Sequence, residues 1–222
     1  MNDPNLELAQ LLCTRLCHDL AGPVGAVAAG VELIGGDPSQ VDAETLGLIG
    51  NSSAAASLKL KFMRGALGAV GASGDPKGLL EGYLDAVAGP SGKPTVAWPS
   101  PEVMTAGALA LGAGWVRIVL NLCLLALETQ PACKSLMFAV NKTGGFTITI
   151  ESRGAPDRAA MLKDELIAAV AGAATPALTA KTVHGNVAGR VVRAAGGTVT
   201  LTASGNCVTV AAIFPASANG AA

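Results

Sequence analysis

Two long segments near the N-terminus carry apolar residues at alternating steps of three and four, and this spacing restricts the fold more than any other feature. It is typical of helices that pack along one seam. The first segment covers residues 6–34 with one shift in phase, and the second covers residues 46–70 without a shift. The first seam consists of Leu6, Ala9, Cys13, Leu16, Leu20, Val24, Val27, Val31 and Ile34.

Helix-breaking residues separate the two segments. "GGDP" at 35–38 is expected to end the first helix, Ser39 and Asp42 are expected to cap the second, and "GASGDP" at 71–76 to end it. Two helices joined by a short loop form an antiparallel hairpin. A lone hairpin leaves one apolar side uncovered, so we predict that residues 1–74 form a homodimeric four-helix bundle.

Residues 75–222 have a mixed pattern that predicts a second domain. Helices are expected over about 77–89, 105–128, 157–171 and 180–195. Strands are expected at "TVAW", "LMFAVN" and "FTITIES", and "GGTVTLTAS" and "CVTVAAIF" form a hairpin around Gly205-Asn206. We therefore predict an α+β sandwich, with helices on one face of a mixed, mostly antiparallel sheet.

Charge and composition exclude some function classes. The formal net charge of −1 provides no basic surface for nucleic acid or an anionic membrane. Residues 106–127 are long enough to span a bilayer, but Arg117 and Asn121 near the middle favour a buried core helix. The N-terminus lacks the features of a secretory signal, so we expect a cytoplasmic protein whose five cysteines are reduced.

The stretch "LCTRLCHDLAGPVG" holds two cysteines and one of only two histidines. Its C-x-x-x-C-H order differs from the C-x-x-C-H of haem attachment, and no second Cys/His pair at metal spacing accompanies it, so haem and zinc remain weak alternatives. Cys13 lies on the seam and is expected in the core. His18 lies off the seam and is expected to face solvent.

Pro23 stands inside the same predicted helix. It has no N–H to donate to the carbonyl of Asp19, four residues back, and it is expected to bend the helix just after His18. An interior proline costs about 3 kcal/mol. A chain that keeps one beside an exposed His-Asp pair is expected to use the bend.

The segment His18-Asp19-Leu20-Ala21-Gly22-Pro23-Val24 resembles the H-[DE]-L-x-x-P-[LV] motif around the phospho-accepting histidine of sensor histidine kinases. "RLCHDL", "PVGA" and "GVELI" resemble more closely the ChpT-type histidine phosphotransferases, which relay phosphate in bacterial cell-cycle circuits. The resemblance extends more weakly through "IVLNLCLLALETQP" and "GGTVTLTAS". It implies a dimeric phosphotransfer hairpin followed by a degenerate kinase-like ATP-binding domain.

The parts with which such a kinase domain binds ATP are missing. The resemblance places Leu125 where a magnesium-binding Asn is required, although Asn121 is present. The adenine-binding D-x-G-x-G falls on Ser152–Pro156, which keeps a single glycine. Two phosphate-loop glycines fall on Thr182 and His184. We therefore expect no bound nucleotide or other cofactor and no metal site in this chain.

The resemblance implies that His18 carries a phosphoryl group between the aspartates of receiver domains, in a hybrid kinase and in response regulators, and that the receiver supplies Mg²⁺. Asp19 is expected either to orient the ring or to be solvated. Arg15 is expected either to hold phosphoryl oxygens or to be solvated, Pro23 is structural, and His184 has no chemical role. A divergent ATP-dependent kinase and a non-catalytic dimeric adaptor are the rival functions.

Overall fold

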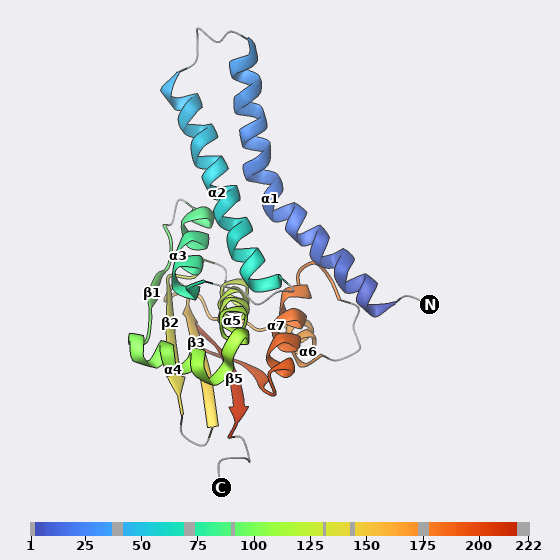
Figure 1. Ribbon diagram of the computed structural model, residues 1–222, viewed down its shortest axis with the longest axis vertical. Helices are drawn as coiled ribbons and strands as arrows, with labels where there is room; N and C mark the ends of the chain where they lie inside the picture. Colours follow the sequence, from blue (N-terminus) through green and yellow to red (C-terminus); the bar gives the residue numbers. More distant parts are fainter. Residues whose placement is uncertain are drawn as a thin grey trace.

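A helical hairpin stands on an α/β domain in the computed structural model of the chain (Figure 1). The structure describes residues 3–36, 42–68, 74–89, 92–130, 132–142, 145–172 and 178–216. The hairpin consists of α1 (Pro4–Gly36) and α2 (Ala43–Leu67), which pack against each other. Asp42 caps α2, as predicted, and its carboxylate accepts a hydrogen bond from the Thr45 amide at 2.6 Å. The predicted cap Ser39 and the end of the second predicted seam, at residues 69–70, lie outside the described residues.

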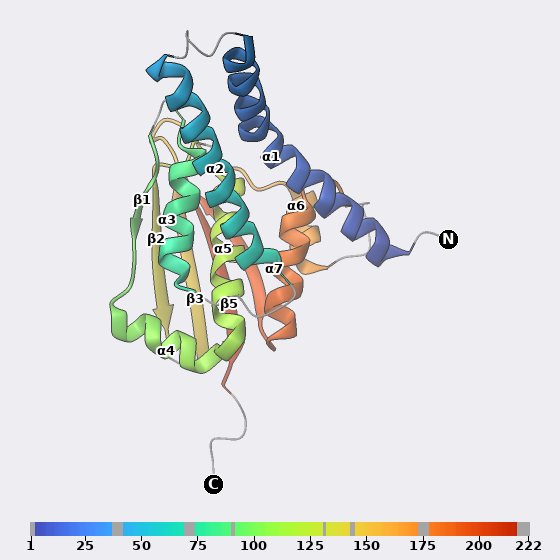
Figure 2. The ribbon, with the colours of Figure 1, turned by 45° about the horizontal axis from the view of Figure 1, so that its top comes forward.

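The second domain contains one five-stranded sheet in the order β1-β2-β3-β5-β4. β1 runs parallel to β2, and the other neighbours are antiparallel, as predicted. The helices gather on one face of the sheet (Figure 2). The strands are β1 (Thr95–Ala97), β2 (Ser135–Asn141), β3 (Gly145–Arg153), β4 (Thr198–Ser204) and β5 (Cys207–Pro215), and the helices are α3 (Pro76–Val87), α4 (Pro101–Leu111), α5 (Trp115–Thr129), α6 (Asp164–Ala171) and α7 (Val183–Ala194).

Two predicted helices differ from the observed ones. The predicted helix at 105–128 is split into α4 and α5 by a short 3₁₀ turn at Gly112–Gly114, because Gly112 adopts a positive φ of 53°. The predicted helix at 157–171 begins only at Asp164. The preceding segment forms no helix, and its Ala160 amide donates instead to the carbonyl of Gly205 in the β4–β5 turn.

The stretch Pro101–Thr129 is apolar and long enough for a membrane span, but 56% of its most apolar window is buried in the protein. The α5 part forms the centre of the core, with Ile118, Leu122 and Leu125 fully buried. This burial, together with the break at Gly112, agrees with the predicted core helix.

The hairpin and the second domain share a single hydrophobic core. Phe62, Met63 and Ala66, in the last turns of α2, are buried in the same cluster as α3, α5 and the sheet. The Phe62 ring stacks on Tyr83 of α3 with centroids 4.3 Å apart. The lower half of α2 therefore belongs to both parts of the protein, and the core crosses the predicted division at residue 74.

Candidate phosphotransfer site

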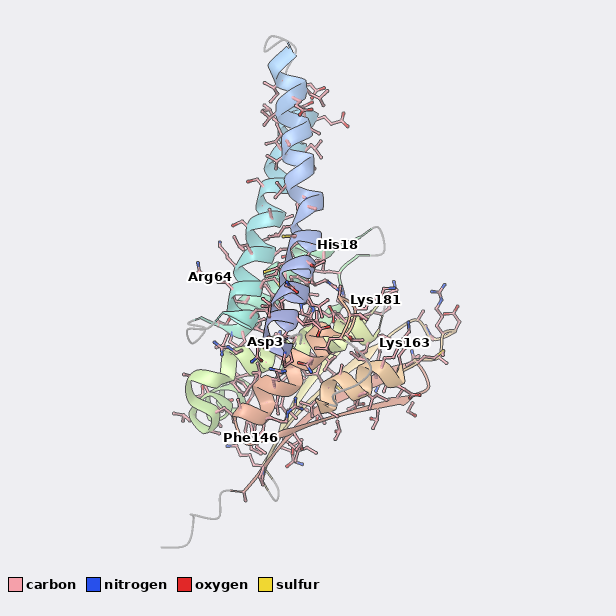
Figure 3. The ribbon with its side chains drawn as sticks, turned by 90° about the vertical axis from the view of Figure 1, so that its right-hand side faces the viewer. Asp3, His18, Arg64, Phe146, Lys163 and Lys181 are labelled. Carbon is pink, nitrogen blue, oxygen red and sulfur yellow. The ribbon has the colours of Figure 1, made fainter. Side chains whose placement is uncertain are left out.

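His18 projects from α1 into solvent, as predicted. Its side chain is 85% exposed. Figure 3 shows it on α1 just above the helices of the second domain, with Lys181 on the same side. Its Nδ1 lies 3.4 Å from Asp19 Oδ1. Since a carboxylate only accepts hydrogen bonds, Nδ1 is the donor when this contact forms, and Nε2 then carries the lone pair of the neutral ring.

The carbonyl of Asp19, four residues before Pro23, has a hydrogen-bond partner on the second helix of the hairpin. α1 continues through Pro23 and changes direction along its length (Figure 1). The Asp19 carbonyl, which Pro23 leaves without its helical donor, accepts a hydrogen bond from Lys59 Nζ of α2 at 3.1 Å. Lys59 thereby satisfies the group that the proline leaves free, directly beside His18. No pattern in the sequence singled out Lys59 for this role.

This contact predicts that the cost of removing Lys59 depends on Pro23. Lys59→Met is expected to lower the free energy of unfolding by about 1–2 kcal/mol, because the half-buried Asp19 carbonyl loses a charged donor. In a Pro23→Ala background the residue-23 amide can donate to that carbonyl, so the same change is expected to cost less than half as much. Urea unfolding of the wild type, Lys59→Met, Pro23→Ala and the double variant measures the two costs. Equal costs in both backgrounds would contradict the contact.

Asp19 and Arg15 are not solvated separately but form an ion pair with each other. Arg15 Nε lies 3.0 Å from Asp19 Oδ2 and 3.2 Å from Oδ1. Arg15 Nη2 lies 3.0 Å from Glu128 Oε1 of α5. Burial opposes the charge of Arg15, but Glu128 and Asp19 outweigh burial and raise its pKa. In the free protein Arg15 is engaged by two carboxylates, which neither of its predicted roles anticipated.

Glu128, the second carboxylate beside Arg15, also contacts a buried histidine. His184, at the start of α7, is only 2% exposed, and its Nδ1 lies 2.6 Å from Glu128 Oε1. Arg15 Nη1 also approaches the carbonyl of Ala180 at 3.4 Å, just before α7. The structure thus brings α1, α5 and the start of α7 together beside His18. Sequence reasoning missed Glu128 and assigned His184 no chemical role, because no local pattern connects these residues with Arg15.

Tyr83 of α3 interacts electrostatically with Asp19, Glu128 and Arg15 of this cluster. Burial, with smaller contributions from Asp19 and Glu128, raises its pKa to about 12. Tyr83 is the only tyrosine in the chain, so the near-ultraviolet absorbance of phenolate reports on it alone. We expect it to ionise near pH 12 in the folded protein.

The unfolded chain releases the Tyr83 proton near pH 10, so the folded state holds that proton more tightly. The resulting stabilisation is complete below pH 10 and is lost as the pH rises toward 12. Urea unfolding at increasing pH measures this loss. Ionisation near pH 10 before unfolding would show that the ring is accessible to water.

Cys13 does not lie in the core, contrary to the prediction. Both Cys13 and Cys17 are exposed, because one hairpin covers only part of the α1 seam. Among the residues that the structure describes, no group of three or more His, Cys, Asp or Glu side chains is arranged to hold a metal ion.

The positions that the resemblance relates to nucleotide binding have structural partners here. Asn121 is 2% exposed, and its amide donates to the carbonyls of Ala66 and Arg117, which ties α5 to the end of α2. Leu125 is completely buried in the core. Thr182 and His184 are buried at the start of α7.

Comparisons with known proteins identify the family of this chain. The family model described as "Histidine phosphotransferase C-terminal domain" matches residues 76–206. The protein phosphotransferase ChpT of Brucella abortus (strain 2308) is 32% identical over 159 residues, which cover 67% of this chain and 69% of that protein. A solved structure of a bacterial phosphotransferase superposes with a TM-score of 0.71 at 24% identity, covering 96% of this chain and 98% of the other. Because the family model spans more than half of the sequence, the chain belongs to the histidine phosphotransferase family.

Proposed function

We propose that this chain relays a phosphoryl group between the aspartates of two receiver domains, with His18 as the covalent carrier. The observation that carries the proposal is the geometry of His18, which is 85% exposed with its Nδ1 turned toward Asp19. An exposed ring can be reached by a partner protein, and a free Nε2 lone pair can attack. Membership of the histidine phosphotransferase family and the likeness to ChpT support the same reaction.

In the forward step Nε2 of His18 attacks the phosphorus of a receiver's phospho-aspartate. The Nε2–P bond forms, the P–O bond to the aspartyl group breaks, and the aspartate leaves as a carboxylate. The Nδ1 proton stays on the ring, and Asp19 Oδ1 stabilises the positive charge that the ring gains. In the second step the carboxylate of another receiver attacks the same phosphorus, and neutral His18 is the leaving group.

The proposal assigns no nucleotide or metal to this chain. A Mg²⁺ ion held by the receiver would supply charge neutralisation for the phosphoryl oxygens, and no residue of this chain is assigned to hold it. Two features support independence from ATP. Leu125 offers no oxygen ligand at the position where the resemblance requires one, and it is buried in the core. Thr182 and His184 are packed side chains at positions where the resemblance requires glycine.

Two labelling reactions on purified protein test the relay against its rivals. With a phosphorylated receiver domain, Mg²⁺ and no free ATP, we expect label on His18 of the wild type and none on His18→Ala. With labelled ATP alone we expect no label. Label from ATP alone would favour a divergent kinase. Absence of label with every receiver tested would favour a dimeric adaptor.

We also propose that the hairpin pairs with a second copy into a four-helix bundle. Among the described residues of the hairpin, seven large apolar side chains are exposed in the single chain, and several belong to the predicted seams: Leu6, Val24, Val31, Leu33, Leu46, Leu48 and Leu60. A second copy that covers this surface would explain why the seams continue where one chain offers them no partner.

The dimer predicts the effect of a charge on the seam. Val31 is 55% exposed, and Val31→Glu is expected to convert the dimer to a monomer, because a two-fold interface buries each new charge twice. Light scattering is expected to give twice the chain mass of 21.9 kDa for the wild type and 21.9 kDa for the variant. Leu109→Glu on α4, where Leu109 is 82% exposed, is the control and is expected to stay dimeric. A wild-type mass of one chain would exclude the dimer.

A further inference from the structure

A continuous line of contacts runs from the core of the second domain to the acceptor ring. We propose that Glu128 and His184 are positioning residues for phosphotransfer, which act on His18 through Arg15 and Asp19. The proposal rests on the proposed function of His18. It gives the second domain a role in the transfer step that needs no nucleotide.

The contacts form an ordered series. His184 Nδ1 lies 2.6 Å from Glu128 Oε1, and the same oxygen lies 3.0 Å from Arg15 Nη2. Arg15 Nε reaches both oxygens of Asp19, at 3.0 and 3.2 Å. Asp19 Oδ1 lies 3.4 Å from His18 Nδ1. Each side chain is thus oriented by the one before it, and the series ends at the ring that attacks.

Burial separates this series from an ordinary surface pair. Side-chain exposure is 85% at His18, but only 16% at Asp19, 26% at Arg15, 16% at Glu128 and 2% at His184. Fixed, partly buried partners hold a charged fork in one geometry, whereas exposed pairs contribute little. The guanidinium suits this task because its planar fork binds two carboxylates at once, which an ammonium cannot do in the same geometry.

Glu128 fixes the position of Arg15, because it holds the guanidinium from α5 while Asp19 holds it from α1. With Glu128 in place the guanidinium is held between α1 and α5, and Asp19 is held with it. Asp19 then accepts from Nδ1–H of His18 and keeps the Nε2 lone pair free. Without Glu128, Arg15 and Asp19 can reorient toward water, and the ring can adopt the Nε2–H tautomer, which cannot attack.

The chain contains only two histidines, and both belong to this series. Selective ¹⁵N labelling of histidine therefore gives two ring signals, and His184→Gln assigns them. In the wild type we expect the His18 ring to populate mainly the Nδ1–H tautomer. In Glu128→Gln, which keeps the size of the side chain and removes its charge, we expect His18 to shift toward the Nε2–H tautomer.

Transfer from a phosphorylated receiver is expected to slow about tenfold in Glu128→Gln, the size of effect typical of an outer-shell partner. The matched control is Glu151→Gln, which removes the carboxylate of another Glu–Arg pair, that with Arg153 at 2.8 Å on β3. We expect the control to leave both the His18 signal and the transfer rate unchanged. Arg15→Lys keeps the charge but loses the fork, and we expect it to reproduce the effects of Glu128→Gln.

The ring spectrum distinguishes failure of this inference from failure of the relay. An unchanged His18 tautomer in both Glu128→Gln and Arg15→Lys would overturn the positioning role, even with slower transfer. Absence of transfer in the wild type would overturn the relay, while the spectrum would still report whether the series orients the ring. If Glu128→Gln does not fold, as judged by circular dichroism, Arg15→Lys alone decides.

Discussion

Replacing His18 by glutamine is expected to lower the rate of phosphoryl acceptance from a receiver by at least about 10³-fold, because the amide has no lone pair able to form the covalent intermediate. The fold is expected to survive, since the side chain is 85% exposed and its polar contact is with the neighbouring Asp19. Single-turnover transfer of label from a phosphorylated receiver measures the effect.

Cys17→Ser is a suitable control for this experiment, because Cys17 is also exposed on α1 and lies next to His18. The control is expected to accept label at nearly the wild-type rate. If His18→Gln is labelled as fast as the wild type, another side chain carries the phosphoryl group.

Replacing Phe62 by alanine is expected to have the largest effect on stability. Phe62 is fully buried, its ring stacks on Tyr83, and it joins the hairpin to the second domain. Loss of such a side chain costs about 3–5 kcal/mol of unfolding free energy through lost burial and the cavity left behind. The corresponding decrease in Tm is roughly 10 °C for a chain of this size.

Thermal unfolding at one fixed protein concentration checks this expectation, because pairing of chains would make Tm depend on concentration. Leu109→Ala is the control. Leu109 is 82% exposed on α4, and its loss is expected to change the unfolding free energy by less than about 0.5 kcal/mol. If Phe62→Ala unfolds like the control, the hairpin and the second domain do not share one core.

Local patterns in the sequence predicted most of the elements. The seams predicted α1 and α2, and the alternation around Gly205-Asn206 predicted the β4–β5 hairpin. Both patterns arise from contacts between residues close in sequence. The two wrong helix boundaries had other causes. Gly112 interrupts an unbroken apolar pattern, and the Ala160 amide donates to the carbonyl of Gly205, in a turn that is distant in sequence.

The seam also shows the limit of periodicity. It identifies the apolar side of a helix but not what covers that side. Cys13 lies on the seam and is nevertheless exposed in the single chain. Exposure of His18, by contrast, followed correctly from its position off the seam, because such a residue faces away from the other helix of the hairpin.

The sequence by itself determined the hairpin, the composition of the sheet, the exposed histidine and the carbonyl that Pro23 leaves unbonded, because each depends on spacing within one element. Only the tertiary structure decided which groups surround His18. Lys59, Glu128 and His184 come from three different helices. Lys59 and Glu128 contact α1, His184 contacts Glu128, and all these contacts depend on how the core packs the helices together. Side chains from separate elements meet only after the fold has formed, so no spacing along the chain reveals them.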